Sequence, residues 1–301
     1  KEWNRNPQDG DLTILGSSFD NTGELSANTW RHVAFIEQDQ ERIAQARESG
    51  RKLIGLGMPT IGPKDTPAAA SGCDGPCGTS RPGEPADLTG TDTTPPDTPE
   101  FRWLMSSDVC KHCTKAGCLD VCPTGALFRT EYGTVVVQQD ICNGCGTCVG
   151  GCPFGVIERR DDGTITTPGG REEVPEKGTA HKCTLCYDRM VDGQVPACAA
   201  TCPTTSIKYG DHDEMVATAE ARVRELHDKG MTEARLYGAN PNDGVGGIGS
   251  VFLLLDEPEV YGLPPDPRVP TNEAPYLWQR AGLAALGLVA ATALAFTGGR
   301  R

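Results

Sequence analysis

The stretch ICNGCGTCVGGCPFGV, residues 141–156, decides the fold of this chain. It holds four closely spaced cysteines followed by Pro153: Cys142, Cys145, Cys148 and Cys152. The spacing x2, x2, x3 is typical of the bacterial run that binds [4Fe–4S] clusters, in which three cysteines ligate one cluster and the fourth ligates another. Glycines should let the backbone wrap closely around the bound group at Gly144, Gly146, Gly150 and Gly151. The stretch therefore predicts a loop-rich, cluster-binding fold.

Two further groups of four cysteines share the Cys-x3-Cys-Pro ending of this stretch. The first group is Cys110, Cys113, Cys118 and Cys122. The third group is Cys183, Cys186, Cys198 and Cys202. The shared ending favours one repeated module over unrelated metal sites. Zinc is the alternative, since zinc ribbons also use paired Cys-x2-Cys elements, although without this ending. Disulfides are more usual in short secreted chains.

The crossing rule of such runs predicts how the ligands are shared. One cluster should be held by Cys110, Cys113, Cys118 and Cys152. A second should be held by Cys142, Cys145, Cys148 and Cys122. The third group has no partner group in this sequence. We therefore expect Cys183, Cys186 and Cys198 to take a fourth ligand from a further cysteine run, and Cys202 to serve the cluster of that run.

Other chemistry-bearing residues give weaker signals. Cys73 and Cys77 lie in a Gly/Pro-rich stretch, and we expect them to be free or disulfide-bonded, with a structural metal as the alternative. His112 and His181 lie beside cysteines and could tune a cluster through hydrogen bonds, but ordinary polar neighbours are the simpler expectation. The sequence shows no catalytic constellation, so we expect a non-catalytic chain.

Composition narrows the class of protein further. The 301 residues carry a formal net charge of −13, which argues against a nucleic-acid partner, because phosphate binding requires basic surface. The 37 glycines and 23 prolines predict many loops. The expected elements are a strand at 30–36, a short helix or loop at 37–50, hairpins at 126–137 and 156–167, a helix at 212–229, a strand at 248–255 and an extended segment at 256–275.

The C-terminal segment predicts a membrane anchor. Between Arg280 and Arg300 lie 19 uncharged residues, nearly enough to cross a bilayer as a helix. Tyr276 and Trp278 precede this run, where an aromatic belt would lie. A buried Ala-rich helix is the alternative. Because Arg300 and Arg301 follow the run, the C-terminus should face the cytoplasm and the cluster domain the outer side.

At these motifs the chain closely resembles the iron–sulfur beta subunit of membrane-bound formate dehydrogenase. The fragments that carry the resemblance are KEWN at 1–4, SSDVCKHC at 106–113, GCLDVCPTGA at 117–126, residues 141–156 above, HKCTLCYDR at 181–189, VPACAATCPT at 195–204 and EPEVYGLPPDP at 257–267. The cysteine spacings are shared by a wider class of subunits that serve molybdopterin oxidoreductases.

The resemblance implies an α+β fold of two ferredoxin-like domains related by pseudo-twofold symmetry, with one C-terminal transmembrane helix. We expect one domain in residues 1–57 plus 175–240 and the other in 100–174. The remaining parts are a Gly/Pro-rich insertion at 58–99, an extended segment at 241–275 and the membrane helix at 276–299. The resemblance places the missing cysteine run directly upstream of Lys1, where it would supply the fourth ligand for Cys183, Cys186 and Cys198 and take Cys202 as its own fourth ligand. Four [4Fe–4S] clusters are expected in the full-length protein, two of them fully liganded within this sequence.

The resemblance also implies partners and a function. Electrons would pass between a molybdenum or tungsten formate dehydrogenase catalytic (alpha) subunit and a membrane cytochrome b (gamma) subunit with its quinone site, with the chain anchored in membrane lipid. The alternative within the same class is the equivalent subunit of a membrane hydrogenase or of another molybdopterin oxidoreductase. The alternative from a different class is a zinc-stabilised structural module.

Overall fold

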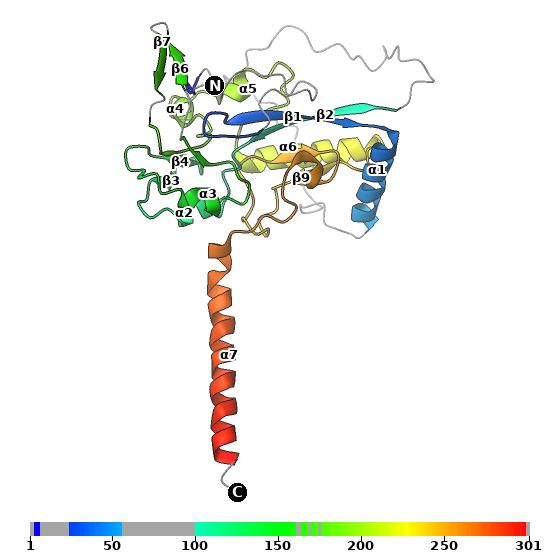
Figure 1. Cartoon of the computed structure of the whole chain (residues 1–301). Coiled ribbons are helices and arrows are strands. Elements are labelled where there is room, and N and C mark those ends of the chain that lie inside the picture. The colour runs from blue at the N-terminus through cyan, green and yellow to red at the C-terminus, as the bar shows by residue number, and fades with distance from the viewer. Residues whose placement is uncertain are drawn as a thin grey trace.

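A computed structural model describes residues 3–6, 24–55, 100–160, 164–167, 170–173 and 176–298, with the backbone alone at 164–167 and 170–173. Cys73, Cys77 and the whole of the expected 58–99 insertion lie outside these residues. Short helices and two-stranded sheets gather around the cysteine loops, and one long helix projects from this body (Figure 1). The chain is therefore of mixed α+β class.

The longest sheet is a ribbon whose second strand leads into the first cysteine group. β1 (Arg31–Gln38) pairs antiparallel with β2 (Arg102–Val109), which ends directly before Cys110. Side chains alternate along β2, because successive residues of a strand face opposite sides: Leu104 is buried and Met105 is exposed. The strand expected at 30–36 is confirmed.

The two longer helices that the sequence suggested within this body are both present. α1 (Gln40–Gly55) resolves the choice between a helix and a loop expected at 37–50 in favour of a helix. α1 approaches a turn so closely that a Cβ at Gly50 would lie 2.2 Å from the Thr232 carbonyl oxygen. The expected helix at 212–229 is α6 (His212–Asp228), which begins where the Asp211 side chain accepts a hydrogen bond from the Asp213 amide at 3.0 Å.

The first expected hairpin is confirmed, and the second is wrong. β3 (Leu127–Arg129) pairs with β4 (Val135–Val137), as expected for 126–137. The expected pairing within 156–167 does not form: β5 (Glu158–Arg159) pairs with β8 (Ala180–His181), and β6 (Thr164–Thr167) pairs with β7 (Gly170–Glu173).

Burial explains the second pairing. The β5–β8 ladder brings together Ile157 and Ala180, which are 0% and 1% exposed in the core shared with β3 and β4. Tertiary burial of this kind outweighs a local turn signal when a strand selects its partner.

A second core lies under the chain that leads to the C-terminal helix. β9 (Arg235–Tyr237) pairs with β10 (Phe252–Leu254), so the expected strand at 248–255 is real but shorter. This core consists of Tyr237, Val245, Ile248, Leu254, Leu263 and Val269. The segment expected to be extended at 256–275 instead contains the 3-10 helix η2 (Pro258–Tyr261) and the start of the last helix.

Four very short helices present the cysteines. They are α2 (Gly117–Asp120), α3 (Thr147–Gly151), α4 (Tyr187–Val191) and α5 (Ala197–Ala200). α2 and α3 pack against each other at glycine, since a Cβ at Gly117 would lie 2.4 Å from the Gly151 carbonyl oxygen. Gly150, expected to serve close wrapping as well, would have no atom within 4 Å of a Cβ.

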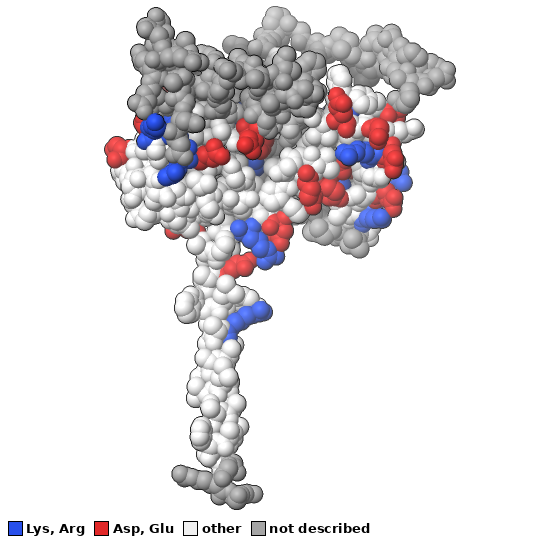
Figure 2. Space-filling view, in the orientation of Figure 1, with Lys and Arg blue, Asp and Glu red and all other residues white. Residues whose placement is uncertain are grey.

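The C-terminal helix α7 (Pro270–Gly298) is long and apolar enough to cross a membrane. Its 29 residues span about 43 Å at 1.5 Å per residue. None of the apolar stretch is buried against the rest of the described chain, and its described residues carry no charge after Arg280. Figure 2 shows most of the projecting helix in white, without acidic or basic side chains. The described residues therefore do not show the alternative of an Ala-rich helix buried within this chain.

Candidate metal centre

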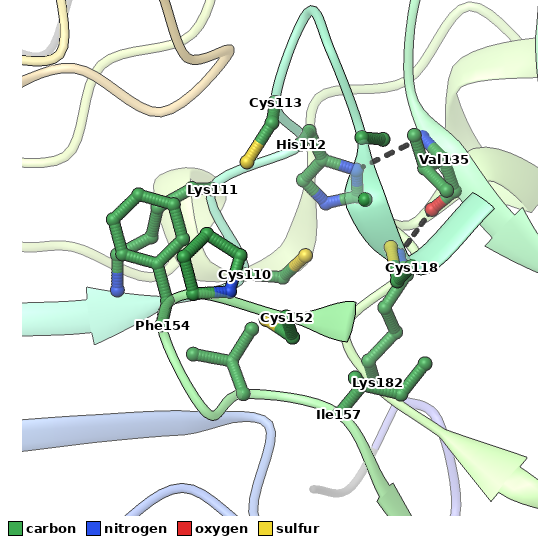
Figure 3. Close-up of a pocket in the computed structure, with 14 residues that line it drawn as sticks. Cys110, Lys111, His112, Cys113, Cys118, Val135, Cys152, Phe154, Ile157 and Lys182 are labelled. Carbon is green, nitrogen blue, oxygen red and sulfur yellow. Dashed lines mark hydrogen bonds between the residues drawn. The ribbon is translucent and has the colours of Figure 1, made fainter. Parts of the chain in front are cut away.

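One pocket brings together four cysteines from two of the sequence groups. Cys110 follows β2, and Cys113 is held by a β-bridge to Ile248. Cys118 lies in α2, and Cys152 directly follows α3. All four line the same pocket (Figure 3), and we call them the first quartet.

The electrostatics of the first quartet favour a bound cation. Burial raises the pKa of Cys113, and the negative charges of its three quartet partners raise it further. Burial likewise raises the pKa of Cys118 to about 12, although Lys182 opposes it. Burial also acts to raise the pKa of Cys110, but His112 and Lys182 outweigh it and lower that pKa to about 5. Thiols that repel one another as thiolates need a positive centre between them to ionise together.

The sulfur atoms stand around a pocket rather than converging on one point. A structural zinc ion draws four sulfur atoms to about 2.3 Å from a single centre. Within the described ranges, no three His, Cys, Asp or Glu side chains approach one another closely enough to hold one metal ion. A [4Fe–4S] cluster is a larger body whose four irons each take one cysteine, so thiols that line a pocket suit it better than they suit a single zinc ion.

The remaining cysteines of groups one and two form a second set. Burial raises the pKa of Cys148 to about 11, and the charges of Cys142, Cys122 and Cys145 act on it in the same direction. We call Cys142, Cys145, Cys148 and Cys122 the second quartet. Cys118 of the first quartet also feels the charge of Cys148, so the two quartets are neighbours.

The repeated Cys-Pro ending has one local structure in groups one and three. Burial acts to raise the pKa of Cys122, but amide groups at 124, 126 and 127 and the Thr124 hydroxyl outweigh it, and its pKa is lowered. The Thr204 hydroxyl and amides at 204, 206 and 207 lower the pKa of Cys202 to about 7. The offsets from cysteine are the same in both turns. Each turn thus aims backbone N–H groups at a ligand sulfur, as cluster sites do.

The third group is not gathered into a quartet within the described residues. Cys183 lies beside the first quartet. Burial raises its pKa to about 12, and the nearby charge of Cys110 raises it further. Cys183 also packs against the small core around Cys110 and Val156. Cys186 is buried before α4, Cys198 lies in α5 and Cys202 follows α5.

Two buried lysines beside the cysteines were missed by the sequence reasoning. Lys182 is 2% exposed, lines the first pocket and donates to the Val135 and Cys183 carbonyl oxygens. Lys111 is 1% exposed, pairs with Asp108 and lies 5.3 Å above the Phe154 ring. Each lysine is next to a ligand cysteine in the sequence: Lys111 follows Cys110, and Lys182 precedes Cys183. This adjacency is a sequence signal for positive charge that offsets the thiolates.

The two histidines have different environments. His181 has both ring nitrogens engaged, with Gln139 at 3.2 Å and Thr179 at 3.0 Å, and burial lowers its pKa to about 4. His181 is thus an ordinary buried polar residue, as expected. His112 lines the first pocket, and its Nδ1 accepts a hydrogen bond from the Val135 amide at 3.1 Å.

Comparisons with known proteins agree with this chemistry. Residues 101–168 and 171–212 match the model of the 4Fe-4S dicluster domain. The chain is 42% identical over 173 residues to the formate dehydrogenase iron-sulfur subunit of Haemophilus influenzae, covering 56% of this chain and 50% of the relative. It is 40% identical over 197 residues to the nitrate-inducible formate dehydrogenase iron-sulfur subunit of Escherichia coli, covering 64% and 60%.

A third relative belongs to a different enzyme. The chain is 43% identical over 115 residues to the thiosulfate reductase electron transfer subunit of Salmonella typhi, covering 38% of this chain and 52% of the relative. The chain spans between half and three-fifths of the length of the relatives it matches. Its cysteine-rich part matches the 4Fe-4S dicluster domain, and the chain is similar along this part and beyond it to the iron–sulfur subunits of formate dehydrogenases.

Proposed function

We propose that this chain is the electron-transfer subunit of a membrane-bound formate dehydrogenase and relays electrons through [4Fe–4S] clusters. The observation that carries the proposal is one pocket lined by four cysteines, two of which are far apart in sequence; beside it, the charges of Cys142, Cys122 and Cys145 act on Cys148. Each quartet takes three members from one sequence group and one from the other. When bound, each cluster supplies a one-electron redox centre.

The chain's own residues hold and insulate these centres. The two cores beside the quartets exclude water from the first pocket, and the buried cations Lys111 and Lys182 offset part of the negative charge of the thiolates. In this proposal the substrate reaction takes place on a molybdopterin catalytic partner.

A continuous path is supported by contacts between sites. Cys148 of the second quartet lies near Cys118 of the first, and Cys110 of the first lies near Cys183 of the third group. We propose that Cys183, Cys186 and Cys198 bind a third cluster with a fourth ligand from outside this sequence, and that Cys202 serves a fourth cluster. Electrons would then pass along the row second quartet, first quartet, third group.

The long helix would anchor this row at a membrane. The Thr271 hydroxyl at the start of α7 donates to Asp120 of α2 at 2.6 Å, so the helix is attached directly to the element that carries Cys118. Tyr276 and Trp278 are exposed near its start, as interfacial aromatics would be. We propose a single transmembrane span with a membrane cytochrome b as partner and the cluster domain on the outer face.

A ligand substitution tests the cluster assignment. Cys122→Ser should remove the cluster of the second quartet and leave that of the first, because only one of the two loses a ligand. Iron, acid-labile sulfide and the electron paramagnetic resonance (EPR) signals of the reduced protein should be measured beside Cys118→Ser, which should do the reverse. Loss of the same signal in both variants would refute the sorting into quartets. Colourless wild-type protein containing zinc would refute the function.

A further inference from the structure

His112 occupies a constrained position between two ligands of the first quartet. Its side chain is 4% exposed, and its backbone φ of 46° lies in the left-handed region that residues other than glycine rarely adopt. Such a conformation persists only where the surroundings impose it. Here the Gly249 amide donates to the Lys111 carbonyl oxygen at 2.8 Å, and a Cβ at Gly249 would lie 3.3 Å from the His112 Cβ. The 247–250 loop thus holds the imidazole against the pocket.

The hydrogen bond to Val135 determines which ring nitrogen carries the proton. A backbone amide can only donate, and the Val135 amide donates to His112 Nδ1 at 3.1 Å. Nδ1 is therefore unprotonated, and in an imidazole with one unprotonated nitrogen the proton resides on the other. His112 consequently presents a single N–H donor, at Nε2.

Among the described residues, no oxygen or nitrogen accepts from this donor. Nε2 of His112 is fully buried and without a hydrogen-bond partner among the described residues. Figure 3 shows this nitrogen turned away from Val135, on the side where the Cys110 sulfur lies. The four cysteine sulfur atoms that line the same pocket are the available acceptors. Buried donors are rarely left unpaired, so a sulfur acceptor is the expected partner.

We propose that His112 Nε2–H donates a hydrogen bond to a sulfur atom at the first quartet, either the Cys110 thiolate or a cluster sulfide, and thereby raises the reduction potential of the cluster bound there. This inference rests on the proposed function, because it requires that cluster. On reduction one electron is taken up and no bond to hydrogen breaks; the proton stays on Nε2. The bond strengthens as negative charge builds up on sulfur, so it stabilises the reduced form more than the oxidised form.

The test compares three substitutions in the full-length protein by redox titration monitored by EPR. His112→Phe removes the donor, while His112→Gln can place an amide N–H near the position of Nε2. His181→Phe is the matched control, because His181 is equally buried and flanks a cysteine but has both nitrogens partnered. The signal of the first quartet is identified by its loss in Cys118→Ser.

At the potential where the wild-type cluster is half reduced, His112→Phe should lower the ratio of reduced to oxidised cluster about tenfold, which is 59 mV for a one-electron couple. His112→Gln should restore most of this ratio, and His181→Phe should leave it unchanged. The wild-type reduced cluster should also show hyperfine coupling to one exchangeable proton that disappears in deuterium oxide and in His112→Phe.

Two outcomes would overturn the inference. One is a reduction potential that is unchanged from the wild type in His112→Phe, or shifted equally in His112→Phe and His112→Gln. Either result would assign His112 a packing role only. The other is the absence of the exchangeable-proton coupling in the wild type, a measurement that remains decisive if His112→Phe fails to fold. Neither outcome resembles failure of the proposed function, in which the wild-type protein would contain no iron and give no cluster signal.

Discussion

Replacing Gly117 by alanine tests the contact that brings the two quartets together. α2 and α3 each carry a ligand cysteine, and they meet where a Cβ at Gly117 would lie 2.4 Å from the Gly151 carbonyl oxygen. That oxygen belongs to the backbone and cannot rotate away. An ordinary contact begins at 3.4 Å, so the helices must separate by about 1 Å, at a cost of about 1–3 kcal/mol for overpacking.

The net effect follows from two opposing terms. Alanine in place of glycine favours a helix by about 0.5–1 kcal/mol, which leaves Gly117→Ala destabilising by about 1–2 kcal/mol. Gly150→Ala is the matched control: it lies one residue from Gly151 in α3, is exposed and would have no atom within 4 Å of its Cβ. Only the helix term applies there, so Gly150→Ala should stabilise by about 0.5–1 kcal/mol.

Cluster release reports this difference without requiring reversible unfolding. A chelator that traps iron from the locally opened protein should bleach the visible absorbance of Gly117→Ala about 5–30 times faster than that of the wild type, since 1–2 kcal/mol changes the open population by that factor. Gly150→Ala should bleach no faster than the wild type. Equal rates for the two variants would refute the argument that glycine at 117 is required by the α2–α3 contact.

Two further predictions concern parts of the chain outside the quartets. Arg102→Met should destabilise by about 3–5 kcal/mol in denaturant unfolding, because Arg102 bonds the fully buried Glu233 at 2.6 Å and its removal leaves that carboxylate with only the longer 3.7 Å contact to Arg47 Nε. Arg222→Met removes an exposed pair with Glu225 and should leave the unfolding midpoint unchanged; equal effects of the two substitutions would refute the role of burial. Deleting residues 276–301 should move the protein from the membrane fraction to the soluble fraction with its iron content intact, whereas continued sedimentation with membranes would mean that another surface anchors it.

Local sequence determined the chemistry of this protein. The spacing of Cys142 to Cys152 and the repeated Cys-Pro ending indicated the clusters, because these ligands belong to short loops whose geometry depends on neighbouring residues. The hairpin after Cys122 was predictable for the same reason, since its turn and both strands lie within 126–137. The apolar C-terminal run likewise indicated a helix long enough to span a membrane, which α7 shows.

Only the tertiary structure decided which segments pair and which side chains reach the clusters. The segment after Cys152 was expected to form a hairpin, but Glu158 pairs with His181 because burial of the neighbouring Ile157 outweighs the local turn signal. The sequence also could not separate His112 from His181, since both adjoin cysteines. The amide of Val135 distinguishes them, because it donates to Nδ1 of His112 and leaves the Nε2–H group facing sulfur. This contact joins residues 23 positions apart, and no spacing rule of the cysteine motifs encodes it.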